Sequence, residues 1–366
     1  MHIVIDARII RSSTGTVVER LLRHLQEIDR RNRYTVLIDR RDDDHWAPMA
    51  ASFTKLLVDV PQHGWAEQTR LRRVIGSLGP DLVHFCMPQQ PLFLRGPAVV
   101  TTFFDLTILR TRNPARSAAA SLVKRAAGFV AFAAAARWSD RVLTTSAYTR
   151  DDLVRTLGAR ADRVVVSHAA AEHRPAALEP VDLPFRRFLL HVGRHPAYKN
   201  LDRLADAHQR LLERHPDLGL VFVGGIDADA EAIRRRCAER GHRNVVFTGF
   251  LSEPKRDWLY AHCAAYVFPS LAEGFGLPGL EAMACGAPVV SSDATCLPEI
   301  YGDAALYFDP RDTGAMATAI GRVLDDGALR SALVAAGRAR VGLYSWRRMA
   351  EETLAVYKAA ARDRSG

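Results

Sequence analysis

Short apolar runs alternate with longer amphipathic segments along the chain, and this alternation restricts the fold more than any other feature. In the first half, the apolar runs are residues 2–7, 34–38, 55–60, 81–85, 98–103, 141–145 and 163–167. Amphipathic stretches between them include residues 17–29, 67–78 and 115–137. Runs of this length are typical of buried strands, and strands that alternate with helices pair in parallel. The pattern therefore predicts an α/β fold in which helices cover both faces of a parallel sheet.

The alternation stops once and then begins again. Residues 172–187, EHRPAALEPVDLPFRR, contain three prolines and no periodicity, which is typical of a linker. Apolar runs resume at residues 188–193, 218–225, 244–250, 264–270, 287–292 and 305–309. Helices are expected between them at residues 200–215, 229–240 and 254–263, and a last amphipathic helix at 345–363. Two Rossmann-like domains are predicted, residues 1–183 and 184–345, with a terminal helix at 346–366. Their strand ends are expected to face a shared cleft, the usual ligand site of such sheets.

Length and cysteine usage favour a cytoplasmic protein. A chain of 366 residues can bury two substantial cores. Its cysteines, Cys86, Cys237, Cys263, Cys285 and Cys296, are widely spaced, and no pair has metal-ligand spacing, so a reducing compartment is expected. The chain starts with a predicted strand rather than a signal peptide, and no apolar run is long enough to span a bilayer.

The net charge of +9 is unevenly distributed. Residues 1–184 hold 26 Lys and Arg against 19 Asp and Glu, a balance of +7; the rest hold 24 against 22, a balance of +2. The excess fits either an anionic membrane surface or an ordinary solvated surface. The segment 115–137 is apolar with basic flanks, so it could contact the inner face of a membrane or serve as a core helix. No nucleic-acid partner is expected.

The stretch FPSLAEGFGLPGLEAMACGAPVVSSD, residues 268–293, predicts a strand–loop–helix–strand unit. Pro278 suits the first turn of the helix, which should stop near Gly286. Glycines in the loop allow close approach of a ligand, and free N–H groups at the helix start suit a phosphate. Glu273 on the loop and Glu281 on the helix could accept hydrogen bonds from a polyhydroxylated ligand. Tight packing alone is the structural alternative.

A second basic segment, VGRHPAYKN at residues 192–200, follows the first strand of the second half. Arg194 and Lys199 in this loop would suit a diphosphate, because Arg binds phosphate bidentately and Lys binds it as a point charge. Asn200 or Asp202 is expected to cap the next helix. Alone, two such cations could equally be solvated surface residues.

Three further loops carry weaker signals. The loop 12–16, with Gly15, could present N–H groups to an anion from the first domain, or simply begin a helix. Asp105 follows a strand in TTFFDLT and could orient or deprotonate a hydroxyl, although Asp is also a common turn residue. The segment 248–253 could contact a base through its backbone, or Ser252 and Glu253 could cap a helix.

Several motifs of other enzyme classes are absent. The first strand is not followed by Gly-x-Gly-x-x-Gly, so the dinucleotide fingerprint fails. The chain also lacks the phosphate-binding motif GxxxxGK[ST], the metalloprotease motif HExxH and the hydrolase elbow Gly-x-Ser-x-Gly.

The motifs together resemble the family 4 retaining glycosyltransferases, group 1. EGFGLPGLEAMACGAPVVSS is similar to the family's E-x7-E signature and HVGRHPAYKNLDRL to its diphosphate segment. FTGFLSEPKRDWLYAHCAAYVFPS, LPEIYGDAALYFDP and SWRRMAEETLAVY resemble its later blocks, whereas IDAR, DLVHF and FFDLT fit more loosely. The resemblance is dense beyond residue 188 and diffuse before it.

The resemblance implies a GT-B fold that binds a nucleoside-diphosphate sugar without a metal. It gives Arg194 and Lys199 the diphosphate, Glu273 the sugar and Glu281 the ribose. It assigns the remaining donor contacts to Gly15, Gly249, Phe250, Leu251, Gly274, Phe275, Gly276 and Leu277. The family usually has His before the Asp of the first-domain motif; here that residue is Phe104, which puts the role of Asp105 in question.

The resulting hypothesis is a retaining glycosyltransferase that transfers a hexose to an acceptor hydroxyl in a glycan, a lipid-linked molecule or a small molecule. GDP-mannose is the preferred donor on similarity to mannosyltransferase-like members, and UDP-sugars stay open. A nucleotide-sugar epimerase or a phosphorylase on the same fold is one alternative. A non-catalytic nucleotide-sugar-binding protein, suggested by Phe104, is the other.

Overall fold

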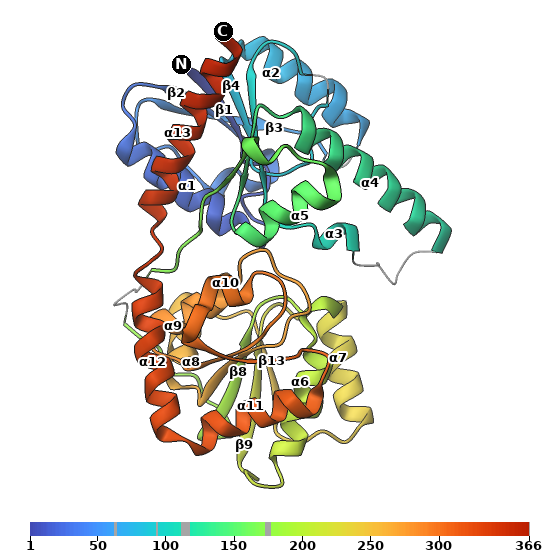
Figure 1. Cartoon of the computed structure of the whole chain (residues 1–366), viewed down its shortest axis with the longest axis vertical. Helices are drawn as coiled ribbons and strands as arrows, with labels where there is room; N and C mark the ends of the chain where they lie inside the picture. The colour runs from blue at the N-terminus through green and yellow to red at the C-terminus, as the bar shows by residue number, and fades with distance from the viewer. Residues whose placement is uncertain (62–63, 93, 111–117, 173–176, 366) are drawn as a thin grey trace. The chain divides into compact units, whose positions relative to one another are not determined.

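A computed structural model describes residues 1–61, 64–92, 94–110, 118–172 and 177–365 (Figure 1). The chain divides into two compact units, Met1–Ala169 with Ser345–Gly366, and Ala170–Tyr344. Each unit is a parallel sheet with helices packed on it, which confirms the predicted α/β class.

The first unit is built on a seven-stranded sheet of order β3-β2-β1-β4-β5-β6-β7. Its strands are β1 (His2–Asp6), β2 (Arg33–Asp39), β3 (Phe53–Val58), β4 (Leu82–Phe85), β5 (Ala98–Phe103), β6 (Arg141–Thr144) and β7 (Val164–Val166). Its helices are α1 (Gly15–Ile28), α2 (Arg72–Leu78), α3 (Thr107–Arg110), α4 (Ala118–Trp138), α5 (Ala147–Leu157) and α13 (Trp346–Ser365). All neighbouring strands pair in parallel, as the alternating pattern predicts.

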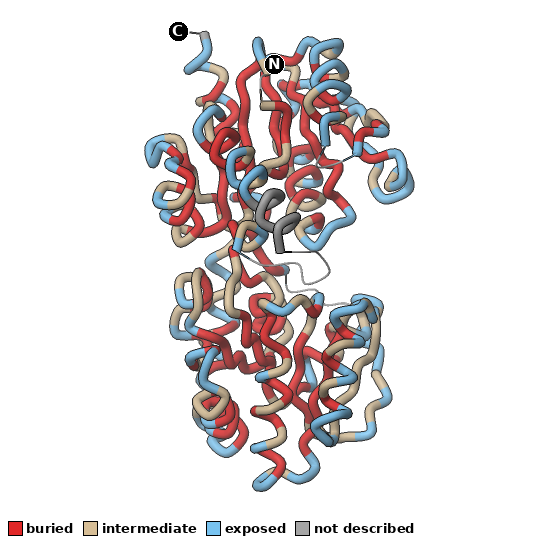
Figure 2. Tube along the Cα trace, turned by 90° about the vertical axis from the view of Figure 1, so that its right-hand side faces the viewer, coloured by how far each residue is buried: buried red, intermediate tan, exposed pale blue. Residues whose placement is uncertain are grey.

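The second unit contains a six-stranded sheet of order β10-β9-β8-β11-β12-β13. Its strands are β8 (Arg187–Val192), β9 (Leu218–Val223), β10 (Val245–Gly249), β11 (Ala265–Phe268), β12 (Val289–Ser292) and β13 (Ala305–Phe308). Its helices are α6 (Leu201–Leu211), α7 (Ala228–Glu239), α8 (Glu253–His262), α9 (Leu277–Ala284), α10 (Leu297–Tyr301), α11 (Thr313–Asp325) and α12 (Gly327–Val341). Figure 2 shows buried segments through the middle of both units, whereas the edge strands β3 and β10 are largely of intermediate burial.

Strand order explains where a ligand site can form in the second unit. The chain runs outward from β8 to β9 and β10, then returns to pair β11 on the other side of β8. The loops after β8 and β11 therefore diverge at the centre of the sheet, and a crevice at such a reversal is the usual binding place in parallel sheets. These are the two loops that carry Lys199 and Glu273.

Some local predictions need adjustment. Part of the proposed linker, residues 173–176, and the first residues of the helix predicted at 115–137, residues 115–117, lie outside the described residues. The helix predicted at 67–78 is divided into a π-helical turn, Glu67–Leu71, and α2. No residue range was predicted for α3, α5, α10, α11 or α12.

Candidate functional site

The loops after β8 and β11 are tied together by their backbones. The Leu271 N–H donates to the Tyr198 carbonyl over 2.8 Å. Asn200 Nδ2 donates to the carbonyl of Pro269 over 3.0 Å and to that of Pro310 over 2.7 Å. These contacts fix the segment that ends in Lys199 against the segment that leads to Glu273.

Of the two candidate caps, Asn200 or Asp202, the structure places Asn200 at the start of α6. Asn200 occupies the N-cap position of α6, but its side chain forms no capping hydrogen bond. Its φ of 61° turns the chain left-handed, which Asn tolerates, and its amide is used between loops instead. Asp202 forms an ion pair with Arg236 of α7 at 2.8 Å.

Lys199 and Glu273 form an ion pair between the loops after β8 and β11. Lys199 Nζ lies 2.7 Å from Glu273 Oε1, and the two side chains are only 10% and 13% exposed. The ammonium also lies 5.0 Å from the ring centre of Phe268 and 5.5 Å from that of Tyr198, within cation–π range. The two residues predicted on separate motifs are thus in direct contact.

The glycines of the next turn are required by close packing. Gly276 has φ of +89°, and a Cβ on it would lie 2.4 Å from the Tyr301 hydroxyl oxygen. A Cβ on Gly279 would lie 2.2 Å from the same atom. That hydroxyl donates to the Gly276 carbonyl over 2.5 Å. Pro278 lies in the first turn of α9, as predicted, so the backbone from Gly274 to Leu277 enters the helix in one tight turn.

Glu281 lies on α9 in a half-buried position. The Tyr260 hydroxyl donates to its Oε2 over 3.4 Å. Burial raises the pKa of Glu281 above its ordinary value, and the positive charge of Arg256 partly offsets this. Burial also raises the pKa of Tyr266, and the charges of Glu281 and Glu273 raise it further, so the two predicted carboxylates lie near one buried tyrosine.

Other residues predicted to contact the donor lie in the loops after β8 and β10. Arg194 is exposed in the loop after β8. Phe250, which follows β10, is 89% exposed, and Ile226, which follows β9, is 47% exposed. A Cβ on Gly249 would lie 3.8 Å from Ile226 Cγ1, so the loops that carry these two exposed apolar side chains are neighbours. We call Ile226 and Phe250 the rim patch; Leu251 beside it is half-buried.

In the first unit, Asp105 and Gly15 are explained locally. Asp105 Oδ1 accepts from the Thr107 N–H over 2.7 Å, an arrangement typical of an Asp that precedes a helical turn. A Cβ on Gly15 would lie 1.7 Å from the Ile10 carbonyl oxygen, so only glycine fits at the start of α1. Neither observation tests a role in binding or catalysis.

Phe104 lines a cavity of about 30 Å³ at the carboxyl end of the first sheet, together with His84, Thr102 and Thr144. That volume suits one or two water molecules rather than a sugar ring. His84 bridges Tyr357 of α13, with Nδ1 2.7 Å from the tyrosine oxygen, and Thr102, with Nε2 2.8 Å from Oγ1. Burial lowers the pKa of His84 to about 3, so the ring is neutral at physiological pH.

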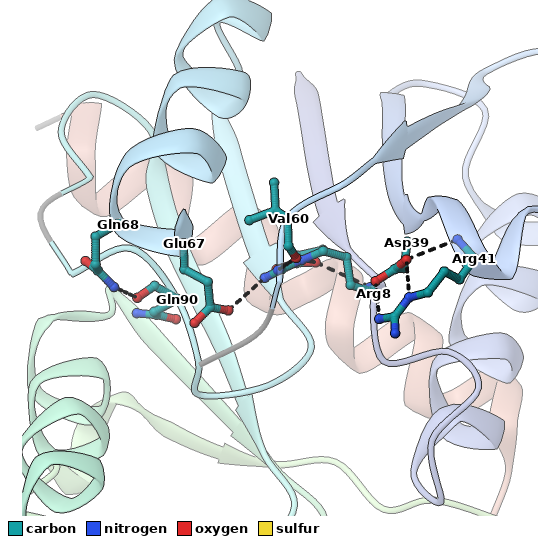
Figure 3. Close-up of polar contacts among 8 residues, drawn as sticks. Arg8, Asp39, Arg41, Val60, Glu67, Gln68 and Gln90 are labelled. Carbon is teal, nitrogen blue, oxygen red and sulfur yellow. Dashed lines mark hydrogen bonds and ion pairs between the residues drawn. The ribbon is translucent and has the colours of Figure 1, made fainter. Parts of the chain in front are cut away.

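The IDAR segment also has a structural explanation (Figure 3). Arg8 is 2% exposed and donates from Nη2 to Asp6 at 2.8 Å and to Glu67 at 3.1 Å. Its Nη1 donates to the Val60 carbonyl over 3.0 Å, so the ends of β1 and β3 are joined to the π-helical turn. The network satisfies a buried guanidinium and fixes the loops at this end of the sheet.

Comparison with known proteins identifies the family of the chain. The family model for glycosyl transferases of group 1 matches residues 186–326, and the model for glycosyltransferase family 4 matches residues 14–173. The glycogen synthase of Mycobacterium tuberculosis is 31% identical over 78% of this chain and 70% of that protein. This chain belongs to glycosyltransferase family 4.

A mannosyltransferase and a solved structure are among the other proteins that resemble this family 4 chain. O-antigen chain mannosyltransferase B of Escherichia coli is 34% identical over 59% of this chain, and the match spans 60% of that protein's length. The sucrose-phosphate synthase structure from Thermosynechococcus elongatus superposes with a TM-score of 0.79 at 20% identity, covering 98% of both chains. The structural likeness confirms the GT-B fold, and the sequence match shows relatedness to mannosyltransferases.

Within the described ranges, no group of three His, Cys, Asp or Glu side chains is arranged to hold a metal ion. Of the helices that the structure describes, none combines the length and apolar character required to cross a bilayer.

Several residues that shape the site carry no local sequence pattern that predicts their position. Thr295 and Cys296 contact the backbone of Glu273, Tyr301 fills the space above two glycines, and Ile226 completes the rim patch. Their positions follow from tertiary packing between loops, which no local pattern reports.

Proposed function

We propose that this chain is a retaining glycosyltransferase that moves a hexose from a nucleoside-diphosphate sugar to an acceptor hydroxyl. The observation that carries the proposal is the buried pair of Lys199 Nζ and Glu273 Oε1, 2.7 Å apart at the reversal point of the second sheet. A cation for a diphosphate and a carboxylate for sugar hydroxyls are thereby adjacent, as recognition of a sugar diphosphate requires.

In the proposed reaction, the bond between the sugar C1 and the diphosphate oxygen breaks. A bond from C1 to the acceptor oxygen forms on the same face, and the proton of the acceptor hydroxyl passes to the departing diphosphate oxygen. Lys199 and the exposed Arg194 stabilise the negative charge on the departing diphosphate, most strongly where water is excluded. Glu273 holds sugar hydroxyls and Glu281 the ribose, with the base on the rim patch. Asp105 is proposed to orient the acceptor hydroxyl.

The preferred donor is GDP-mannose. The support is the 34% identity to O-antigen chain mannosyltransferase B, a protein named for mannosyl transfer to a polysaccharide chain. We accordingly propose a glycan or lipid-linked acceptor and a cytoplasmic site of action. Because the sequence match covers 60% of that relative, UDP-sugars belong in the same test.

A thermal-shift panel tests this function. GDP, GDP-mannose, UDP, UDP-glucose and UDP-N-acetylglucosamine are added separately to the full chain, and one nucleotide and its sugar should raise Tm. Stabilisation by none of them would remove the donor site. An epimerase would consume the donor without an acceptor and without releasing nucleoside diphosphate. A phosphorylase would depend on inorganic phosphate. A non-catalytic protein would bind the nucleotide without turnover.

We also propose that the first unit contacts an anionic membrane surface. Ile108 is 56% exposed, and Phe129 and Val130 on α4 are 43% and 65% exposed, while residues 132–136 of the same helix are buried. The apolar exposed face and the basic balance of residues 1–184 together favour contact with acidic lipids. Sedimentation with phosphatidylglycerol vesicles, but not phosphatidylcholine vesicles, is expected, and Val130→Asp should reduce it. Equal sedimentation of the variant would contradict this contact.

A further inference from the structure

The loop after β12 lies against the backbone of Glu273. The Glu273 N–H donates to Thr295 Oγ1 over 3.0 Å, and Cys296 Sγ donates to the Glu273 carbonyl oxygen over 3.3 Å. Two consecutive residues of one loop thus hold both main-chain polar groups of the proposed sugar-binding residue. Cys296 is completely buried, so its contact is shielded from water.

Thr295 makes its contact from an unusual backbone conformation. Its φ is 56°, and among the described residues the only other non-glycine positions with positive φ are Asn200 and Asn244. Asn adopts this conformation readily, whereas a β-branched residue does so at a cost. Such strain persists only where the surrounding structure determines it, and it concentrates at functional sites.

The same segment also supports the turn beyond Glu273. Cys296 occupies the N-cap position of α10, and Tyr301 on α10 donates to the Gly276 carbonyl. The chain from Glu273 to Gly276 is therefore held at its first residue by Thr295 and Cys296 and at its last by Tyr301. Lys199 contacts the carboxylate from the opposite loop.

We propose that Thr295 is a positioning residue that fixes the Glu273 backbone and thereby directs its carboxylate to the donor sugar. Thr295 acts through the Glu273 backbone, as a positioning residue rather than a catalytic one. The ligand part of this inference rests on the proposed function; the positioning part does not. Cys296 acts in the same way from the carbonyl side.

Hydrogen exchange in the free protein tests the positioning. Thr295→Val keeps the branched shape and removes the acceptor, whereas Thr295→Ser keeps the hydroxyl. Losing one hydrogen bond should speed exchange in the peptide 271–276 by about two- to tenfold in Thr295→Val. Thr295→Ser and the exposed-helix control Thr318→Val should match the wild type. Cys296→Ala, which leaves Thr295 intact, should raise exchange less.

Unchanged exchange in Thr295→Val would overturn the inference. If that variant failed to fold, unchanged exchange in Cys296→Ala, whose wild-type thiol holds the carbonyl of Glu273, would overturn it instead. These outcomes need no nucleotide, so they are distinguishable from failure of the proposed function, which the thermal-shift panel decides.

Titration with GDP and GDP-mannose tests the ligand part. Thr295→Val should leave the Kd for GDP unchanged and reduce the affinity gained from the mannosyl group, as Glu273→Gln should. Thr295→Ser should restore that gain, which a merely structural role would not predict. The assignment would be refuted if the ratio of the Kd for GDP to the Kd for GDP-mannose in Thr295→Val equalled the wild-type ratio while the same ratio was reduced in Glu273→Gln.

Discussion

Replacing Lys199 by Met tests whether the buried pair links stability to donor binding. The substitution keeps most of the side-chain volume but leaves the Glu273 carboxylate 13% exposed and without its cation. Breaking a buried pair from one side costs roughly 3–5 kcal/mol, and slight exposure favours the lower end, about 3 kcal/mol. For a unit of this size, 3 kcal/mol corresponds to a fall in Tm of about 6–12 °C.

The matched double variant separates the two effects. In Lys199→Met/Glu273→Gln neither charge remains, so much of the lost stability should return, because no uncompensated carboxylate is buried. Affinity for GDP should stay low in both variants, since the cation proposed to bind the diphosphate is absent. Lys255→Met, an exposed lysine of the same unit, controls for loss of one positive charge.

Differential scanning calorimetry and GDP titration of the three variants provide the measurements. The reasoning is refuted if Lys199→Met is as stable as Lys255→Met, or if the double variant is less stable than Lys199→Met. Wild-type GDP affinity in Lys199→Met would separate the pair from donor binding.

Three further predictions concern Phe250, Tyr357 and Glu281. Phe250→Ala should weaken nucleotide binding by about 1–3 kcal/mol in titration calorimetry, as loss of base stacking does, and leave Tm nearly unchanged because the ring is 89% exposed. Tyr357→Phe should lower the free energy of unfolding by about 1–3 kcal/mol in urea, because the buried His84 loses a hydrogen-bond partner, while GDP affinity stays constant. Burial raises the pKa of Glu281, so the folded state binds its proton more tightly, and this group destabilises the fold as pH rises from its ordinary pKa of 4.5 to the raised pKa of the folded state, and by a constant amount above it. Any stability gained by Glu281→Gln should therefore be greater near neutral pH than in acid, and a pH-independent difference in urea unfolding would contradict that assignment.

The fold was predictable because its signal is local and repeated. Runs such as residues 188–193 and 218–225 are apolar on both faces, which suits parallel strands buried between helices, and the structure places both in the sheet. Helices with weaker patterns, such as α12, were not predictable, since Ala and Gly fill much of its length.

The candidate site was predictable only in part. Arg194, Lys199, Glu273 and Glu281 could be named because each lies in a dense motif, either in the loop after a strand or, for Glu281, on the helix that follows. Lys199 and Glu273 are 74 residues apart in the sequence, and the pairing of β8 with β11 brings them into contact. No local pattern predicts that pairing. Thr295 escaped prediction because its left-handed conformation is imposed by packing rather than favoured by its own chemistry.

The most direct test is a crystal structure of the full chain with GDP-mannose, or with whichever panel nucleotide sugar stabilises it. We expect diphosphate oxygens within hydrogen-bond distance of Lys199 Nζ, sugar hydroxyls on Glu273 and the base against Phe250. A nucleotide bound elsewhere, or a diphosphate that does not contact Lys199, would contradict the central claim.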